Sequence, residues 1–132
     1  MQQYAGKLCG RALDYLNQID KEKTIVYTVK KYISKHYAEE LTRDSLAQLV
    51  YLNPDYLSRI FRMETGDSLS NYLIRFRIGR AQELLINTDL PIHQVASAVG
   101  YTNFSYFAKI FRKYVQYNPN EYRKKMTNNT NH

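Results

Sequence analysis

Apolar side chains recur along most of the chain at the spacing of an α-helix. In a first stretch, Val26, Val29 and Ile33 fall on one face and Tyr37 continues it, while lysines occupy outward positions. In a second stretch, residues 68–87, the same spacing is kept by Leu69, Tyr72, Leu73, Phe76, Leu84 and Leu85. Glycine and proline are scarce, at five and three residues, and no stretch alternates as a strand would. The pattern predicts an all-α protein.

The chain also contains one pattern twice. The tetrapeptide RIFR at residues 59–62 returns as KIFR at residues 109–112, inside longer segments that match over residues 45–72 and 91–122. Equivalent positions of the two segments are 49 residues apart before an internal turn and 50 apart after it. The turn of the second segment therefore contains one inserted residue. The matched positions are Leu46-Ala47 with Val95-Ala96, and Leu57, Ile60, Phe61, Arg62 and Tyr72 with Phe107, Ile110, Phe111, Arg112 and Tyr122. This agreement indicates a repeated supersecondary unit.

Each unit is predicted to contain a short helix, a tight turn and a longer helix. Gly100 supplies the positive φ that a sharp turn often needs, and the first unit has Tyr51 at that place. Asn53 and Pro54 then suit the N-cap and the first position of a helix. The longer helices are expected over residues 54–64 and 103–114. Both units therefore predict a helix-turn-helix, which leaves the outer face of its second helix free to enter a DNA major groove.

The expected organisation is two homeodomain-like three-helix units joined by a long helix. The predicted parts are a linker helix or remnant of an upstream region (1–24), a first helix-turn-helix subdomain (25–67), a connecting helix (68–87), a second helix-turn-helix subdomain (88–126) and a disordered tail (127–132). A connecting helix of about twenty residues spans roughly 30 Å, near the roughly 34 to 36 Å between successive major-groove faces of B-DNA. A tandem pair in one chain predicts two dissimilar DNA blocks about 10 base pairs apart, not a palindrome.

The outward faces of the two longer helices supply the candidate base contacts. The inner stripes are predicted to be Leu57, Ile60 and Phe61 in the first unit and Phe107, Ile110 and Phe111 in the second. The positions that then face outward are Asp55, Ser58, Arg59, Asn103, Phe104, Ser105, Ala108 and Lys109. Arg59 can bond guanine O6 and N7 with two hydrogen bonds. Lys109 is its equivalent, and its less directional ammonium suits either a base or a phosphate.

Several of these positions have two possible roles. Asp55 stabilises the dipole of its helix as an acid in the first turn, or accepts from cytosine N4. Ser58 and Ser105 suit a base or a phosphate, and Ala108 suits a thymine methyl group. Phe104 either contacts a thymine methyl group or covers the core of its own unit.

Phosphate contacts, which position a protein without reporting sequence, are predicted for Arg62, Arg75, Arg77, Arg112 and Lys113. Only some of the arginines on the connecting helix, including Arg80, can face DNA. The alternative for one of them is a structural ion pair with Glu83 or Asp44.

Charge and composition agree with a nucleic-acid partner. The 132 residues carry a net charge of +7, and residues 93–132 hold six basic side chains against one acidic one. A basic end favours a polyanion. The first unit is nearly neutral, so one alternative is that one unit binds DNA while the other docks on RNA polymerase or a regulatory domain. An apolar fraction of 44% with 13 tyrosines and 5 phenylalanines suffices for one domain or two small subdomains.

No catalytic or cofactor chemistry is suggested. Cys9 is the single cysteine, and His36, His93 and His132 show no metal-ligand spacing. The carboxylates form no general acid and base pair, so we expect no enzyme activity, cofactor or metal. Neither a membrane span nor a signal peptide is evident, and we expect a cytoplasmic location at the bacterial nucleoid.

A known family has the same order and spacing of residues. They are Arg77-Ile78, Ala81, Leu85, Ile92, Val95-Ala96, Gly100-Tyr101, Phe107, Phe111, Asn118-Pro119 and Glu121-Tyr122-Arg123. Together with YLSRIFRMETG of the first unit, they make residues 25–125 resemble the DNA-binding domain of the AraC/XylS family of bacterial transcription regulators. The segment YTVKKYISKHYAEELTRDSLAQL is most similar to the C-terminal output domain of YesN-like response regulators.

This resemblance implies two helix-turn-helix subdomains that insert in adjacent major grooves of double-stranded DNA and recruit or position RNA polymerase. It implies a sequence-specific transcription regulator, predicted to be an activator, that serves as the output domain of a two-component system. The receiver domain of such proteins is absent from this chain, which we expect to be a standalone regulator or an excised output domain.

Two positions depart from the family pattern. Gln116 stands where the family usually has glycine and where the first unit has Gly66, which predicts a strained or reshaped turn before Asn118. Tyr51 stands where a small residue is frequent. Neither position lies on the predicted outward faces.

Overall fold

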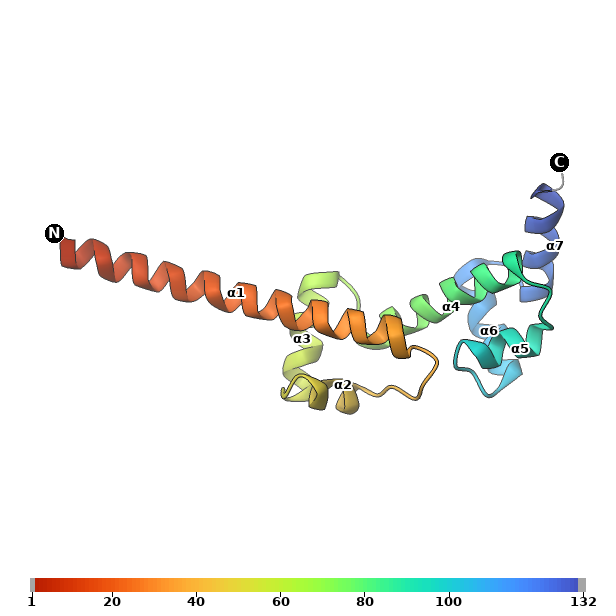
Figure 1. The fold of residues 1–132 in the computed structure, drawn as a ribbon, viewed down its shortest axis with the longest axis horizontal. Helices are drawn as coiled ribbons and strands as arrows, with labels where there is room; N and C mark the ends of the chain where they lie inside the picture. Colours follow the sequence, from red (N-terminus) through yellow and green to blue (C-terminus); the bar gives the residue numbers. More distant parts are fainter. Residues whose placement is uncertain (1, 131–132) are drawn as a thin grey trace.

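The computed structural model describes the backbone of residues 2–130 and the side chains of residues 12–128, and this part of the chain is entirely helical outside its turns. The helices are α1 (Gln2–His36), α2 (Arg43–Leu49), α3 (Pro54–Thr65), α4 (Leu69–Asn87), α5 (Ile92–Ala98), α6 (Phe104–Val115) and α7 (Pro119–Thr130). They form an elongated molecule with its two ends far apart (Figure 1). The all-α prediction is confirmed.

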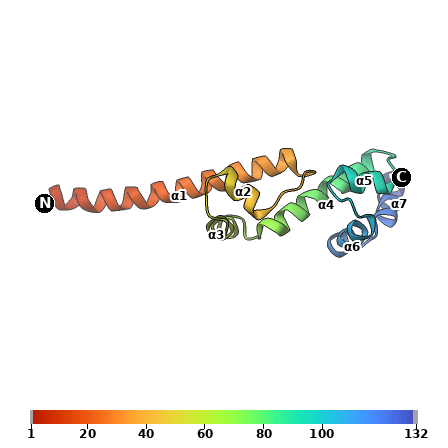
Figure 2. The ribbon, with the colours of Figure 1, turned by 90° about the horizontal axis from the view of Figure 1, so that it is seen from below.

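The first helix is longer than the sequence pattern indicated. Residues 2–24 of the predicted linker and the first helix of the first unit form one continuous helix, α1, and residue 1 lies outside the described residues. Its N-terminal half projects away from both units, as the two ribbon views agree (Figures 1 and 2). Leu13, Tyr15 and Leu16 on this half are exposed.

The core of the first unit lies between α1, α2, α3 and the start of α4. Its buried members are Val26, Val29, Ile33, Leu46, Ala47, Leu57, Ile60, Phe61 and Leu69. Phe61 meets the half-buried Tyr72 edge to face, with ring centroids 5.2 Å apart. The predicted inner stripe of the longer helix is therefore confirmed.

The second unit repeats this core with α4, α5, α6 and α7. Its buried members are Ile78, Ala81, Leu85, Val95, Ala96, Val99, Tyr101, Phe107, Phe111 and Tyr122. Phe111 meets Tyr122 edge to face at 5.6 Å, in the manner of Phe61 with Tyr72. Because the start of α4 packs in the first core and its end in the second, this helix joins the two units.

The predicted repeat is confirmed at the level of the backbone. The short helices α2 and α5 lie 49 residues apart and the longer helices α3 and α6 lie 50 apart. The N-caps Asn53 and Asn103 keep the second offset. Val50 and Val99, the C-caps of the short helices, keep the offset of 49. The inserted residue therefore lies in the turn of the second unit, between Val99 and Asn103.

Gln116 adopts the backbone conformation of the glycine that it replaces. It has φ 76° and ψ 1° at the end of α6, and Gly66 has φ 77° and ψ 4° at the end of α3. The left-handed region disfavours residues with a Cβ atom. Of the two outcomes that the sequence left open, the turn is thus strained and not reshaped.

The C-terminal end differs from the prediction. Residues 127–130, expected to be disordered, continue α7 as helix, and residues 131–132 lie outside the described residues. Arg123 on this helix donates to the backbone oxygens of Leu85, Leu90 and Thr88 at 3.0, 2.7 and 3.3 Å. These hydrogen bonds tie α7 to the end of α4 and to the loop that follows it.

Candidate nucleic-acid interface

The two longer helices present the predicted outer positions to solvent. On α3, Arg59 and Arg62 are exposed and Ser58 is half-buried. On α6, Phe104, Ser105, Lys109, Arg112 and Lys113 are exposed and Ala108 is half-buried. Each helix is held by a buried stripe, so its outer face can meet a partner without disturbing the core.

A hollow of about 360 Å³ lies beside the outer face of α3, and we call it the basic hollow. It is lined by Arg43 from α2, Ser58, Arg59 and Arg62 from α3, and Ser68, Leu69 and Ser70 from the start of α4. Three guanidinium groups around one hollow, next to the positive end of the α4 dipole, favour an anion. The arrangement suits the phosphates and guanine edges of DNA.

Sequence reasoning missed Arg43, Ser68 and Ser70. Thr42 caps α2 by accepting from the Ser45 backbone N–H at 3.0 Å, which makes Arg43 the first residue of that helix. The N-cap at Thr42 was the sequence signal that could have placed Arg43 at the start of a helix. The approach of α2 and the start of α4 to α3 depends on the tertiary packing, which local periodicity does not report.

Arg59 is supported from α1 through an aromatic ring. Its guanidinium lies over the Tyr56 ring, with Cζ 5.2 Å from the centroid. The Tyr56 hydroxyl donates to Glu22 Oε1 at 2.8 Å and accepts from Gln18 Nε2 at 3.1 Å. The hydrogen bond to Glu22 raises the pKa of Tyr56 above its usual value, because it favours the protonated phenol. Thus α1 fixes the ring against which Arg59 rests.

Asp55 and Asn103 have structural partners. The Asp55 carboxylate lies 3.4 Å from Arg43 Nη1, in the first turn of α3, and is largely exposed. Asn103 Oδ1 accepts from the Tyr106 backbone N–H at 2.9 Å, which caps α6. This cap leaves the Asn103 amide NH₂ as the group best placed to donate to DNA.

The second unit has a corresponding hollow of about 440 Å³, the apolar hollow. It is lined by Ile92 from α5, Phe104 and Ala108 from α6, and Asn118, Pro119 and Asn120 from the start of α7. Five of these residues occupy positions that line the basic hollow under the repeat offsets of 49 and 50, and Phe104 has no counterpart there. Arg43 is replaced by Ile92 and Ser58 by Ala108, while Ser68 and Ser70 are replaced by asparagines. Lys109 and Arg112, the equivalents of Arg59 and Arg62, are basic but do not line the apolar hollow.

Arg77 has a structural role. Its Nε donates to the Tyr37 backbone oxygen at 2.6 Å and its Nη2 to that of Glu39 at 2.8 Å. Its Cζ also lies 5.2 Å from the centroid of the Tyr101 ring. These contacts join the loop after α1 to the turn of the second unit, and they engage the guanidinium group that was predicted to contact a phosphate.

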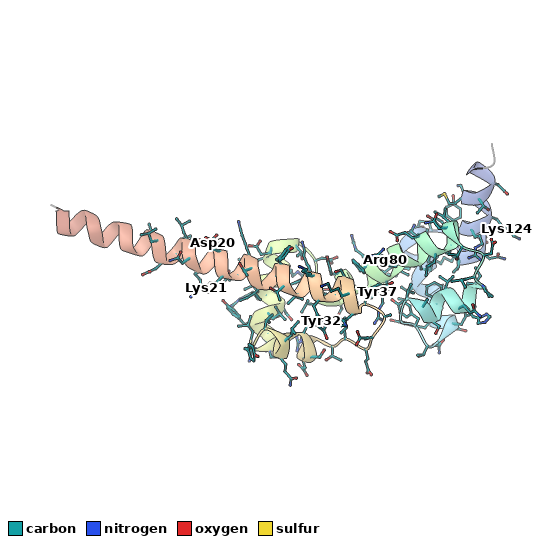
Figure 3. The ribbon with its side chains drawn as sticks, viewed as in Figure 1. Asp20, Lys21, Tyr32, Tyr37, Arg80 and Lys124 are labelled. Carbon is teal, nitrogen blue, oxygen red and sulfur yellow. The ribbon has the colours of Figure 1, made fainter. Side chains whose placement is uncertain are left out.

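The other two arginines of the connecting helix are more exposed. Arg75 Nε lies 3.4 Å from Asp67 Oδ2, and Arg80 Nη1 bonds Glu83 Oε2 at 2.9 Å. The predicted ion pair with Glu83 is confirmed for Arg80, and none to Asp44 occurs among residues 12–128. Figure 3 shows Arg80 close to Tyr37, where the two units meet, and its Cζ lies 5.8 Å from that ring.

Neither a metal-binding cluster nor a membrane-spanning helix occurs in the part of the chain that the structure describes. No three His, Cys, Asp or Glu side chains there are grouped so as to hold a metal ion. None of its helices is both long and apolar enough to cross a bilayer.

Residues 46–125, more than half of the chain, match the family described as a helix-turn-helix domain. The transcriptional regulatory protein YesN of Bacillus subtilis is 33% identical over 96 residues, which cover 67% of this chain and 26% of YesN. The chain belongs to the AraC/XylS family. The predicted resemblance to YesN-like output domains is confirmed, and the family consists of DNA-binding transcription regulators.

Solved AraC/XylS-type structures have the same fold. The C-terminal domain of AraT, a response regulator from Geobacillus stearothermophilus, is 40% identical with a TM-score of 0.75, covering 76% of this chain and 84% of AraT's. The DNA-binding domain of AdpA, a global transcriptional factor solved in complex with a target DNA, is 27% identical with a TM-score of 0.73, covering 76% and 90%. The chain spans 37%, 38% and 33% of the length of the first curated relatives.

Proposed function

We propose that this chain binds double-stranded DNA sequence-specifically and regulates bacterial transcription, with α3 and α6 inserted in adjacent major grooves. One observation carries the proposal. The inner stripe of the longer helix is buried in the first unit and, apart from the half-buried Ile110, in the second. The equivalent basic pairs, Arg59 with Arg62 and Lys109 with Arg112, are exposed on the outer face. A helix that is anchored by its inner face and carries basic side chains on its exposed outer face meets the requirements of major-groove contact.

The connecting helix supports the use of both units on one DNA face. With 19 residues, α4 spans about 28 Å, close to the roughly 34 to 36 Å of one turn of B-DNA. The target should therefore contain two unlike blocks whose centres lie about 10 base pairs apart.

The roles follow from the geometry of the interface. Arg59 and Lys109 contact bases, assisted by Asp55, Ser58, Ser105, Ala108, Phe104 and the amide of Asn103. Phosphate contacts are assigned to Arg62, Arg75, Arg112 and Lys113, with Arg43 added from the basic hollow. Arg77 is not included, because its guanidinium is bonded to two backbone oxygens.

The regulatory setting is part of the same proposal. The likeness to YesN and to the response regulator AraT supports a role as the output domain of a two-component system. In that setting the domain positions RNA polymerase and takes its signal from a receiver domain.

Two substitutions test the base contacts. Arg59→Ala and Lys109→Ala should each weaken a selected target by roughly 1 to 3 kcal/mol, and each should relax a different base position. Fluorescence anisotropy at one fixed salt concentration measures both effects. Lys21→Ala, on α1 (Figure 3), removes one positive charge from a residue that lines neither hollow and should leave affinity unchanged.

The same variants decide between the proposal and its alternative. If Arg59→Ala changed neither affinity nor specificity, the first unit would have no role on DNA. The result would favour the arrangement in which that unit docks on a protein.

Lys113 tests the phosphate contacts separately. Lys113→Ala should weaken all sequences about equally and reduce the salt slope of binding by about one unit. A loss of specificity with an unchanged salt slope would contradict this assignment.

A further inference from the structure

The two hollows share five equivalent positions, and two of these positions differ in chemistry. Arg43 of the basic hollow is replaced by Ile92 in the apolar hollow, and Ser58 is replaced by Ala108. In the first turn of the helix that follows, Leu69 is replaced by Pro119. The first hollow can donate hydrogen bonds from its walls, whereas the walls of the second are mainly hydrocarbon.

The second unit has apolar side chains on α6 that do not belong to its buried core. Phe107 and Phe111 are fully buried, but Phe104, in the first turn of α6, is 46% exposed. Ala108 follows four residues later, so the two side chains lie on the same face of the helix. Together they offer an apolar patch beside the exposed Ser105 and Lys109.

The polar residues of the apolar hollow offer few groups for base recognition. Asn118 Oδ1 accepts from the Glu121 backbone N–H at 2.8 Å and so caps α7. Pro119 has no backbone N–H. Asn120 is exposed. A ligand group that enters the hollow therefore meets chiefly Ile92, Phe104 and Ala108.

The charge around the apolar hollow indicates the class of partner. Lys109, Arg112 and Lys113 are exposed on the same helix, which favours a polyanion over an apolar protein segment. Among the groups in the major groove, the C5-methyl group of thymine is the one apolar substituent. It is small and projects from the base edge.

We propose that the apolar hollow holds the C5-methyl group of a thymine in the second block of the DNA target. This inference rests on the proposed function and adds the chemistry of one base position. The second block then requires thymine through Phe104, Ala108 and Ile92, while the first block is contacted by the arginines of the basic hollow.

Deoxyuridine provides the test, because it differs from thymidine by this methyl group alone. In a selected duplex, each thymine of the second block is replaced in turn by deoxyuridine, and affinity is measured at fixed salt. One position should lose affinity about fourfold, the effect of one buried methyl group. Replacement of thymines in the first block should leave affinity unchanged.

Matched variants connect the effect to the hollow. In Phe104→Ala protein, thymine and deoxyuridine at the sensitive position should bind about equally, because the wall that contacts the methyl group is missing. Phe104→Leu keeps an apolar side chain there and should retain the preference. Since Phe104 is partly exposed, both variants should fold, which thermal unfolding checks.

The outcomes separate the two proposals. If both blocks are selected but no thymine of the second block is sensitive to deoxyuridine, the methyl site is overturned while DNA binding stands. A preference for thymine that persists in Phe104→Ala would also overturn it. If no duplex is enriched and binding is absent, the proposed function itself fails.

Discussion

The turns of the two helix-turn-helix units have the same backbone requirement but different surroundings. Tyr51 and Gly100 both have positive φ, at 58° and 104°. The Tyr51 side chain is 94% exposed, whereas a Cβ atom at Gly100 would lie 3.0 Å from the Ala38 oxygen and 3.0 Å from Arg77 Cζ. Glycine is therefore required in the second turn by its neighbours and not by φ alone.

The same contrast extends along each unit. The first unit ends its longer helix with Gly66 and has arginines around its hollow, while the second ends with Gln116 and has an apolar hollow. The buried stripes remain equivalent. The two units therefore share their core and differ at the surface, which is what two dissimilar DNA blocks would require.

The largest expected effect is at Gly100. Gly100→Ala should lower the free energy of unfolding by about 3 kcal/mol, because it combines positive φ with contacts that must shift. Gly66→Ala is the matched control, since its φ is also positive but a Cβ atom there meets nothing within 4 Å. That variant should lose only about 1 kcal/mol. Equal losses in urea unfolding would show that close packing does not distinguish the two turns.

Arg77 should have the next largest effect. Arg77→Ala removes two charge-assisted hydrogen bonds to backbone oxygens and should cost about 2 to 3 kcal/mol of unfolding free energy. Arg80→Ala, which breaks an exposed ion pair on the same helix, should cost less than about 1 kcal/mol.

DNA binding distinguishes the two possible roles of Arg77. The salt slope measured on folded Arg77→Ala protein should equal that of the unsubstituted chain, because no phosphate contact is lost. An unchanged stability with a slope reduced by one unit would restore the phosphate contact predicted from the sequence.

The smallest effect is expected when the C-cap residues of the two longer helices are exchanged. Gln116→Gly should raise the free energy of unfolding by about 0.5 to 1 kcal/mol, because glycine adopts left-handed φ without strain. Gly66→Gln should lower it by a similar amount. Thermal unfolding of the pair measures both, and a destabilised Gln116→Gly would mean that the side-chain bond from Gln116 Nε2 to the Lys113 oxygen outweighs the strain.

The core and the repeat could be predicted because they depend on local periodicity. Leu57, Phe61, Phe107 and Phe111 are buried as their spacing indicated. The roles of Arg43 and Arg77 could not, since each depends on segments that are brought together only by tertiary packing. For Arg77 the partners are backbone oxygens about forty residues away, which have no sequence signature.

The sequence predicted which side chains of the two longer helices face outward, but not the chemical surroundings of those side chains. The inner stripe left Ser58 and Ala108 on the outside, and the structure adds what surrounds them. One side chain lines a hollow with three arginines, and the other lines a hollow with Ile92 and Phe104. That difference, and not the outward position itself, separates the two units.

Selection of bound duplexes from a randomised library, at a stated salt concentration and followed by sequencing, tests the central claim most directly. The account predicts enrichment of two unlike blocks with centres about 10 base pairs apart, the second containing thymine. Enrichment of one block alone, or salt-sensitive binding without any enriched sequence, would contradict the claim that both units contact bases along one face of DNA.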